Sequence, residues 1–280
     1  FHFELMEIDH EPGNKWKPKE WRLTELKRIF GRWYEGLKEK GWNSLFMSNH
    51  DQPRMVSRFG DDGRYRVESA KMLATLLHTL PGTPFVYQGE EIGMTNVAFA
   101  TIEDYRDIET LNTFREGIAD GVPEDEIMAV IHRTSRDNAR APMQWDDGLN
   151  AGFTAGAPWI KVNPDYKQIN VASDLRNPNS ILHYYRRLIR LRKENPAIVY
   201  ADYRPILEED EHIYAYLRIL GNDRFLVILN FFRDPVTFSL PNSITYQGKK
   251  VLISNYDVSS EDDMAKLALR PYEARVYQLF

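Results

Sequence analysis

Three segments of the chain carry apolar residues at every third or fourth position, and this spacing predicts amphipathic helices. The segments are Pro18–Lys40, Tyr65–Leu80 and Ser180–Glu194. Short apolar runs of strand length precede or separate them, at residues 1–7, Leu45–Met47 and Thr83–Gln88. Strands that alternate with helices are typical of a parallel sheet covered by helices, so this part of the chain is predicted to be α/β.

The pattern changes near residue 200, where short strands follow one another without helices. Ile213–Leu220 and Phe225–Phe232 flank the turn Gly221–Asp223, which predicts a β-hairpin. Further strands are predicted at Val236–Leu240, Lys250–Ile253 and Ala274–Leu279. Consecutive strands of this kind predict a small antiparallel β-sandwich. We therefore expect two domains, residues 1–200 and 201–280.

Residues 97–160 form a long excursion with little hydrophobic periodicity, apart from a short helix predicted at Pro123–His132. Long ordered loops in compact domains usually carry function. The excursion holds acidic and basic residues that could anchor a site. They are Asp104, Arg106, Asp107, Glu109, Arg136, Asp137 and Arg140.

Composition and charge exclude several classes of partner. The 280 residues carry a net charge of −5 with no long basic run, which argues against a nucleic-acid partner. The chain has no cysteine, so it has no disulfide framework and no thiolate metal site. No apolar run reaches transmembrane length and no signal peptide is visible, so no membrane partner is expected. These observations favour a cytoplasmic enzyme.

Candidate chemistry concentrates directly after the apolar run Leu45–Met47. Asn49, His50, Asp51 and Arg54 follow within a few positions, and Pro53 stops the strand from continuing. Parallel α/β proteins build their active sites from side chains at the carboxyl ends of strands. An imidazole, a carboxylate and a guanidinium at such an end therefore predict an active site.

This stretch and several others resemble the alpha-amylase superfamily, in its branch of oligo-1,6-glucosidases and trehalose-6-phosphate hydrolases. The resemblance begins with Phe-Met-Ser-Asn-His-Asp-Gln-Pro-Arg at residues 46–54 and covers nearly the whole chain. The other similar stretches are Gln88–Asn96, Asp104–Asn112, Ser135–Asp146, Asn150–Gly156 and Leu269–Tyr277.

The resemblance implies that the chain is the C-terminal part of a (β/α)8 TIM barrel followed by the β-sandwich. Residues 1–7 would then be the sixth barrel strand, and the two later apolar runs the seventh and eighth. A whole barrel of this kind needs roughly 250 residues. We therefore expect the N-terminal half of the same barrel to be a partner of this chain.

The resemblance also implies roles for individual residues. Asp51 would be the catalytic carboxylate that stabilises the transition state, and His50 and Arg54 would bind substrate. Arg136 would hold the glucose at the non-reducing end, and Glu109 would border the subsite beyond the scissile bond.

Two more sites of interest lie outside this set. Lys15 lies in the region where relatives contact the leaving-group side of the substrate. Of the neighbouring Glu90 and Glu91, one is expected to pair with the arginines of the pocket and the other to be structural. The family's nucleophile and acid/base belong to the fourth and fifth strands, and neither motif occurs in this sequence.

The activity that the resemblance implies is retaining hydrolysis of α-glucosidic bonds at the non-reducing end of short gluco-oligosaccharides. The substrate would be a small oligosaccharide or disaccharide, and neither a metal nor a cofactor is expected. Three alternatives stay open: a trehalose-6-phosphate hydrolase, a sucrose isomerase or transglucosidase, and a non-catalytic carbohydrate-binding fragment.

Overall fold

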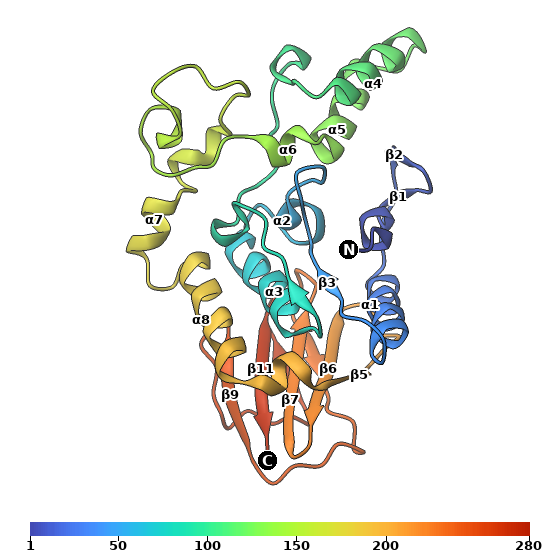
Figure 1. The fold of residues 1–280 in the computed structure, drawn as a ribbon, viewed down its shortest axis with the longest axis vertical. Helices are drawn as coiled ribbons and strands as arrows, with labels where there is room; N and C mark the ends of the chain where they lie inside the picture. The colour runs from blue at the N-terminus through green and yellow to red at the C-terminus, as the bar shows by residue number, and fades with distance from the viewer.

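The molecule is elongated and has three levels in Figure 1, from a long excursion at the top to an antiparallel sheet at the bottom. The computed structural model describes residues 1–280. The middle level holds helices α1 (Leu23–Leu37), α3 (Arg66–Thr79) and α8 (Ile181–Glu194) around two short parallel strands. No helix is both long enough and apolar enough to cross a membrane.

The two parallel strands are β3 (Ser44–Leu45) and β4 (Thr83–Pro84), with Ser44 opposite Thr83. Helices α2 (Met55–Phe59) and α3 connect them, as expected for a β/α unit. Both strands are shorter than the apolar runs predicted. The two strands pair only with each other, so only a few residues have the hydrogen bonds that define a strand.

The prediction of a strand at residues 1–7 is wrong. Glu4–Glu7 form a 3₁₀ turn, η1, because the amide of Met6 donates to the carbonyl of Phe3 at 2.8 Å. The backbone thus closes its hydrogen bonds locally instead of pairing with β3. Phe1 still reaches the strands through its side chain, since its ring lies 4.6 Å from that of Phe85.

The first predicted helix is five residues too long at its start. Asn14–Pro18 form strand β2, which pairs with β1 (His10–Glu11) so that Pro18 lies opposite His10. Proline has no amide proton, so it fits such a two-stranded edge. The α3 and α8 predictions are confirmed to within one residue at each end. Pro196 follows the end of α8 and begins a further short helix, α9 (Pro196–Tyr200).

The excursion contains three helices, α4 (Ile108–Ala119), α5 (Glu124–Thr134) and α6 (Asp137–Arg140). The α5 prediction is confirmed, whereas α4 was not predicted. Only Thr110 of α4 is buried. Its apolar residues Ile108, Leu111, Phe114 and Ile118 do recur at helical spacing, so the sequence held a signal for this helix that was overlooked. Helix α7 (Val171–Arg176) leads from the excursion into α8. Four short 3₁₀ turns complete this part of the chain: η2 (Glu90–Ile92), η3 (Ile102–Asp104), η4 (Leu149–Gly152) and η5 (Pro164–Lys167).

The bottom level is a five-stranded antiparallel sheet in the order β5-β6-β7-β11-β9. Its strands are β5 (Asp202–Ile206), β6 (Ile213–Leu220), β7 (Asp223–Asn230), β9 (Lys249–Ser254) and β11 (Ala274–Leu279). A second pair, β8 (Val236–Phe238) and β10 (Leu267–Leu269), packs over its outer face. The predicted hairpin is confirmed as β6 and β7, while β5 and β10 were not predicted.

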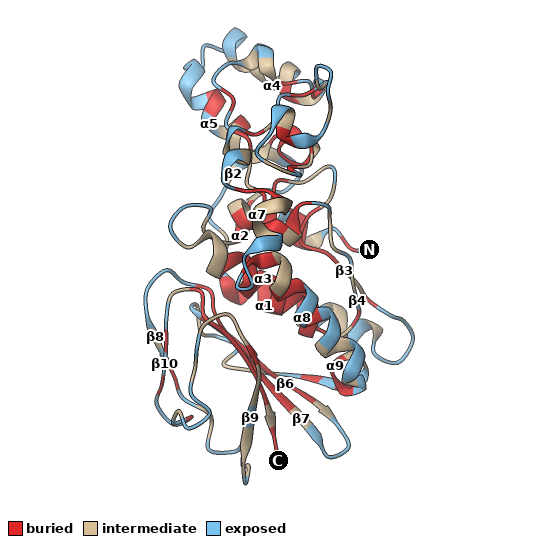
Figure 2. Ribbon diagram, turned by 90° about the vertical axis from the view of Figure 1, so that its left-hand side faces the viewer, coloured by how far each residue is buried: buried red, intermediate tan, exposed pale blue.

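One hydrophobic core joins the helices to the inner face of this sheet. Leu73 of α3 and Tyr184 of α8 belong to the same buried cluster as Tyr214 of β6 and Val276 of β11. Figure 2 shows the buried residues running along α1 and α3 and into strands β6 and β7. The guanidinium of Arg218 crosses this boundary and donates to the carbonyl of Thr79, at the end of α3, at 2.5 Å.

Candidate active site

Asp51 follows the C-terminal end of β3, in the loop that leads to α2. Its amide donates to the side chain of Asn49 at 2.8 Å, which fixes the turn that presents the carboxylate. The Asp51 side chain is 42% exposed, so a ligand can reach it. His50 is more exposed, and its Nε2 lies 3.2 Å from Asp51 Oδ2.

Two arginines from the excursion approach the other oxygen of Asp51. Arg140 Nη2 donates to Oδ1 at 2.5 Å, and Arg140 Nε donates to the carbonyl of His50 at 3.0 Å. Arg136 Nη1 lies 3.8 Å from the same Oδ1. The sequence analysis gave Arg136 a role in binding glucose, but it listed Arg140 only among the charged residues of the excursion. The four-residue spacing of Arg136 and Arg140 could have indicated a shared role, since it places both side chains on one side of a helical turn.

Asp107 lies behind these arginines and is the N-cap of α4. Its Oδ1 accepts from Arg136 Nε at 3.1 Å and also from Arg136 Nη2, and it lies 3.6 Å from Arg140 Nη1. Burial alone would raise the pKa of Asp107. Hydrogen bonds from Arg136 and Thr110, together with the guanidinium charge, outweigh burial, so the pKa lies below its ordinary value.

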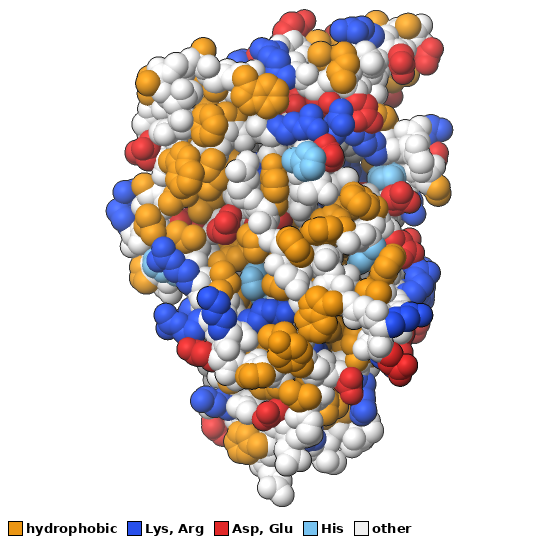
Figure 3. Space-filling view, in the orientation of Figure 1, with side chains coloured by type: hydrophobic (Ala, Val, Ile, Leu, Met, Phe, Trp, Pro, Cys, Tyr) orange, Lys and Arg blue, Asp and Glu red, His pale blue; other side chains and the backbone are white.

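Glu109 extends this network to the β1–β2 hairpin. Its Oε2 accepts from Lys15 Nζ at 2.8 Å and lies 3.4 Å from Arg136 Nε. Lys15 therefore reaches the site from a segment almost a hundred positions away along the chain. Figure 3 shows basic and acidic side chains crowded beside a histidine in the upper part of the molecule.

Arg54 does not join this cluster, which corrects its prediction as a substrate-binding residue. It is fully buried, and its three guanidinium nitrogens donate to the backbone carbonyls of Gln88, Asn138 and Ala139. With 1% exposure it offers no donor to a ligand. Arg54 instead ties the β3 loop to the chain after β4 and to α6, and so it supports the site from behind.

Glu90 and Glu91 also differ from the prediction, because neither carboxylate bonds to an arginine. Glu90 is buried, and Ser48 Oγ donates to its Oε1 at 2.5 Å. Glu91 accepts from the amide of Gly89 at 2.9 Å. Burial raises the pKa of Glu90 to about 8, against the hydrogen bond from Ser48. Glu90 therefore holds its proton to a higher pH than an exposed glutamate does.

Comparison with known proteins identifies the family. A model described as "Alpha amylase, catalytic domain" matches residues 1–201. The chain belongs to the alpha-amylase family. A second model, "Maltogenic Amylase, C-terminal domain", matches residues 203–276. The family resemblance and the fold class predicted from the sequence are thus confirmed.

Individual members of the alpha-amylase family are similar along the whole chain. An oligo-1,6-glucosidase of Parageobacillus thermoglucosidasius is 57% identical over 280 residues, which are all of this chain and 50% of that protein. The crystal structure of trehalose-6-phosphate hydrolase from Bacillus licheniformis has a TM-score of 0.96 at 47% identity, over 100% of this chain and 51% of that one. Isomaltulose synthase from Klebsiella sp. LX3 has a TM-score of 0.93 at 40% identity, over 99% of this chain and 50% of that one. The chain spans about half the length of the curated relatives it matches.

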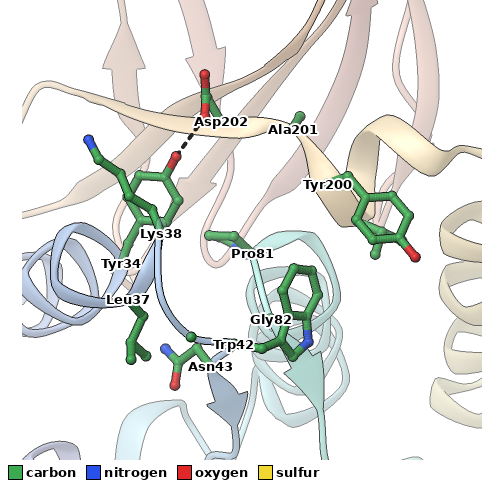
Figure 4. Close-up of a pocket in the computed structure, with 12 residues that line it drawn as sticks. Tyr34, Leu37, Lys38, Trp42, Asn43, Pro81, Gly82, Tyr200, Ala201 and Asp202 are labelled. Carbon is green, nitrogen blue, oxygen red and sulfur yellow. Dashed lines mark hydrogen bonds between the residues drawn. The ribbon is translucent and has the colours of Figure 1, made fainter.

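A hollow of about 100 Å³ elsewhere on this alpha-amylase family chain is remote from Asp51. Trp42 and Tyr200 flank it in Figure 4, with ring centroids 5.9 Å apart. Trp42 precedes β3, whereas Asp51 follows it, so the hollow and the site lie beyond opposite ends of that strand. No group of three His, Asp or Glu side chains in the chain is arranged to hold a metal ion.

Proposed function

We propose that the full-length protein hydrolyses α-glucosidic bonds at the non-reducing end of short gluco-oligosaccharides, with retention of configuration. The observation that carries this proposal is the 57% identity, over the whole chain, to a protein named as an oligo-1,6-glucosidase. Two further proteins of that name are 53% and 52% identical. A trehalose-6-phosphate hydrolase is the second candidate, since that of Bacillus subtilis is 43% identical and the structure of that from Bacillus licheniformis matches the whole chain with a TM-score of 0.96.

The charged network supports a role for Asp51 in transition-state stabilisation. Arg140 occupies Oδ1 of Asp51, whereas Oδ2 has only the exposed His50 beside it and can accept from hydroxyls of a sugar. A glycosidase transition state resembles an oxocarbenium ion, and hydrogen bonds to ring hydroxyls strengthen as it forms. An anion fixed beside the ring therefore stabilises the transition state more than the ground state.

His50, Arg136, Glu109 and Lys15 complete the proposed substrate site. Arg136 and His50 offer donors on the side of Asp51. The Lys15–Glu109 pair lies further out, where the leaving group would sit. Arg54 has no part in substrate contact. The nucleophile and the acid/base are supplied by the remainder of the full-length protein.

We further propose that residues 1–200 and 201–280 are two domains that pack together through a shared core, and that the N-terminal half of the barrel covers β4. The free edge of β4 supports this partner, because β4 pairs only with β3 and the amide of Val86 donates no backbone hydrogen bond. Phe85, beside that edge, is 44% exposed. Buried parallel strands carry apolar residues on both faces, and an uncovered edge of this kind fits a missing neighbour.

The test is the activity of the purified full-length protein on isomaltose, maltose, sucrose and trehalose 6-phosphate. Isomaltose should be hydrolysed with the highest kcat/KM, and NMR should detect α-glucose as the first product. A preference for trehalose 6-phosphate would establish the second candidate instead. Conversion of sucrose to isomers without net hydrolysis would identify an isomerase, and binding without turnover of any of the four would exclude a glycosidase.

A further inference from the structure

We propose that Asp107 is a positioning residue of the active site, which acts by holding Arg136 and Arg140 in place around Asp51. This inference rests on the proposed glycosidase function. The Asp107 side chain is 1% exposed, so it cannot contact a substrate directly. Any effect that it has on turnover must therefore pass through its neighbours.

Both oxygens of Asp107 bond to the start of α4, but only Oδ1 also contacts the arginines, since Oδ1 accepts from the amide of Glu109 at 3.4 Å. Oδ1 faces the arginines, with Arg136 Nε at 3.1 Å and Arg140 Nη1 at 3.6 Å. Oδ2 accepts from the hydroxyl of Thr110 at 3.0 Å and from the amide of the same residue at 3.4 Å. Bonds to α4 from both oxygens fix the orientation of the carboxylate, and Oδ1 in this fixed position orients the two guanidiniums.

The backbone beneath Asp107 is also fixed. Asp137 is fully buried, and its Oδ2 accepts from the amides of Arg106 and Asp107 at 2.6 and 2.9 Å. The hydroxyls of Thr110 and Ser135 lie 2.8 Å apart and join α4 to the segment that carries Arg136. Asp107 is thus held rigidly with respect to α6, which suits a residue that must place other side chains accurately.

Charge explains why a carboxylate is needed here. The network contains three acids, Asp51, Asp107 and Glu109, and three bases, Lys15, Arg136 and Arg140. In Asp107→Asn, the two arginines would keep only Asp51 and Glu109 as acidic partners. Both guanidiniums would then move toward Asp51, which would change its position and occupy oxygens needed by sugar hydroxyls. A misplacement of about 1 Å at a reacting centre costs on the order of 10²-fold in rate.

The experiment is a double-mutant cycle in the full-length protein that combines Asp107→Asn with Asp51→Asn. In the wild-type background, Asp107→Asn should lower kcat by about 10- to 100-fold with a much smaller change in KM. In the Asp51→Asn background, the same substitution should have little further effect, since the residue through which it acts has already lost its charge. Equal losses in both backgrounds would overturn the proposal.

Asp165→Asn is the matched control. Asp165 is a partly buried carboxylate in η5, just after the excursion, but it accepts from the neutral side chains of Thr95 and Gln144 at 2.7 and 2.8 Å. Its loss should change thermal stability and leave kcat unchanged. If Asp165→Asn lowered kcat as much as Asp107→Asn does, the effect would be one of folding and the positioning role would be wrong.

Thr110→Val keeps the test decisive if Asp107→Asn fails to fold. This isosteric change removes the hydroxyl that bonds to Oδ2 of Asp107 and to the hydroxyl of Ser135, so it loosens Asp107 and should lower kcat severalfold in the wild-type background alone. No loss of kcat, or the same loss in Asp51→Asn, would overturn the proposal.

Wild-type turnover is measured first, so a failure of the proposed function is visible on its own. If the wild type prefers trehalose 6-phosphate, the cycle is run on that substrate.

Discussion

Among single residues, Asp51 is the one whose charge should matter most to turnover. Asp51→Asn keeps the size of the side chain and an oxygen that can accept from Arg140, so the loop should stay in place. The negative charge that faces the developing cation is lost. Removal of one such electrostatic group costs about 3–4 kcal/mol, so kcat should fall on the order of 10² to 10³ while KM changes far less. Steady-state kinetics of the full-length protein on isomaltose measure this.

A thermal melt is the control for Asp51→Asn. The variant should unfold within a few degrees of the wild type, because the side chain is partly exposed and its amide-to-Asn49 bond remains. A folded variant with near-normal kcat would remove Asp51 from the catalytic machinery.

Glu90 should make stability depend on pH. Its folded-state pKa of about 8 lies above the value of 4.5 for an ordinary glutamate, so the folded state retains a proton that the unfolded chain releases. The free energy of unfolding is therefore lowered progressively as the pH rises from about 4.5 to 8. Glu90→Gln should remove this dependence. It should melt like the wild type near pH 4.5 and be more stable near pH 8, by about 3–5 kcal/mol.

Melting curves at several pH values check this expectation. Equal shifts of the variant and the wild type across the whole range would show that Glu90 ionises normally. Glu91→Gln is a suitable comparison, since Glu91 is more exposed and bonds only to the turn beside it.

At the scale of elements, a buried ion pair joins the turn η1 to helix α2. Arg58 Nε donates to Asp9 Oδ2 at 2.9 Å, and Arg58 Nη2 donates to the carbonyl of Met6 at 2.6 Å. The two side chains are 3% and 9% exposed. Arg58→Ala would leave the carboxylate of Asp9 buried without a partner, which typically costs 3–5 kcal/mol.

Chemical denaturation measures the loss in Arg58→Ala, and Arg28→Ala is its control. Arg28 pairs with Glu209 on the surface, where the two side chains are 61% and 79% exposed, so its removal should cost about 1 kcal/mol or less. Similar losses in the two variants would contradict the assignment of Arg58 as a structural tie.

The elements also show what a sequence can and cannot predict. Helices α3 and α8 and the β6–β7 hairpin were predicted closely because each buries a regular apolar pattern. Helix α4 was missed although Leu111 and Phe114 lie at helical spacing, because its apolar face is narrow and only partly buried. The site was predicted where side chains follow a strand end, as for Asp51. The sequence could not show that Arg54 is buried or that Arg140 pairs with Asp51. Both facts depend on contacts between segments more than eighty positions apart.

At the scale of the whole molecule, the 280-residue chain by itself should not hydrolyse p-nitrophenyl α-glucoside. The proposed mechanism needs two carboxyl groups that flank the bond, one as nucleophile and one as acid/base. Asp51 is neither of them. Co-production with the rest of the polypeptide should restore turnover. Turnover by the chain alone would require a different catalytic assignment.

The surface that receives the rest of the barrel can be tested in the same complementation assay. Phe85→Asp should reduce both recovery of the complex and its activity, because it puts a charge at the uncovered edge of β4. Phe153→Asp is the control, since Phe153 is 46% exposed and Phe85 is 44% exposed, but Phe153 lies in the excursion. Equal recovery of the two variants would place the contact surface elsewhere.

The position of Arg218 limits how freely the C-terminal sheet can be exchanged between proteins. Its guanidinium is fully buried and donates to carbonyls of Thr79, Ile198 and Ala201, all of which precede the sheet in the chain. A sheet transplanted without these acceptors would contain an unsatisfied buried cation. The shared core leads to the same conclusion, because separation of the sheet would expose apolar surface on both partners. The two regions should therefore melt as one cooperative unit, and recombination at residue 202 should succeed only between relatives in which the end of α3 and helix α9 place these carbonyls in the same positions.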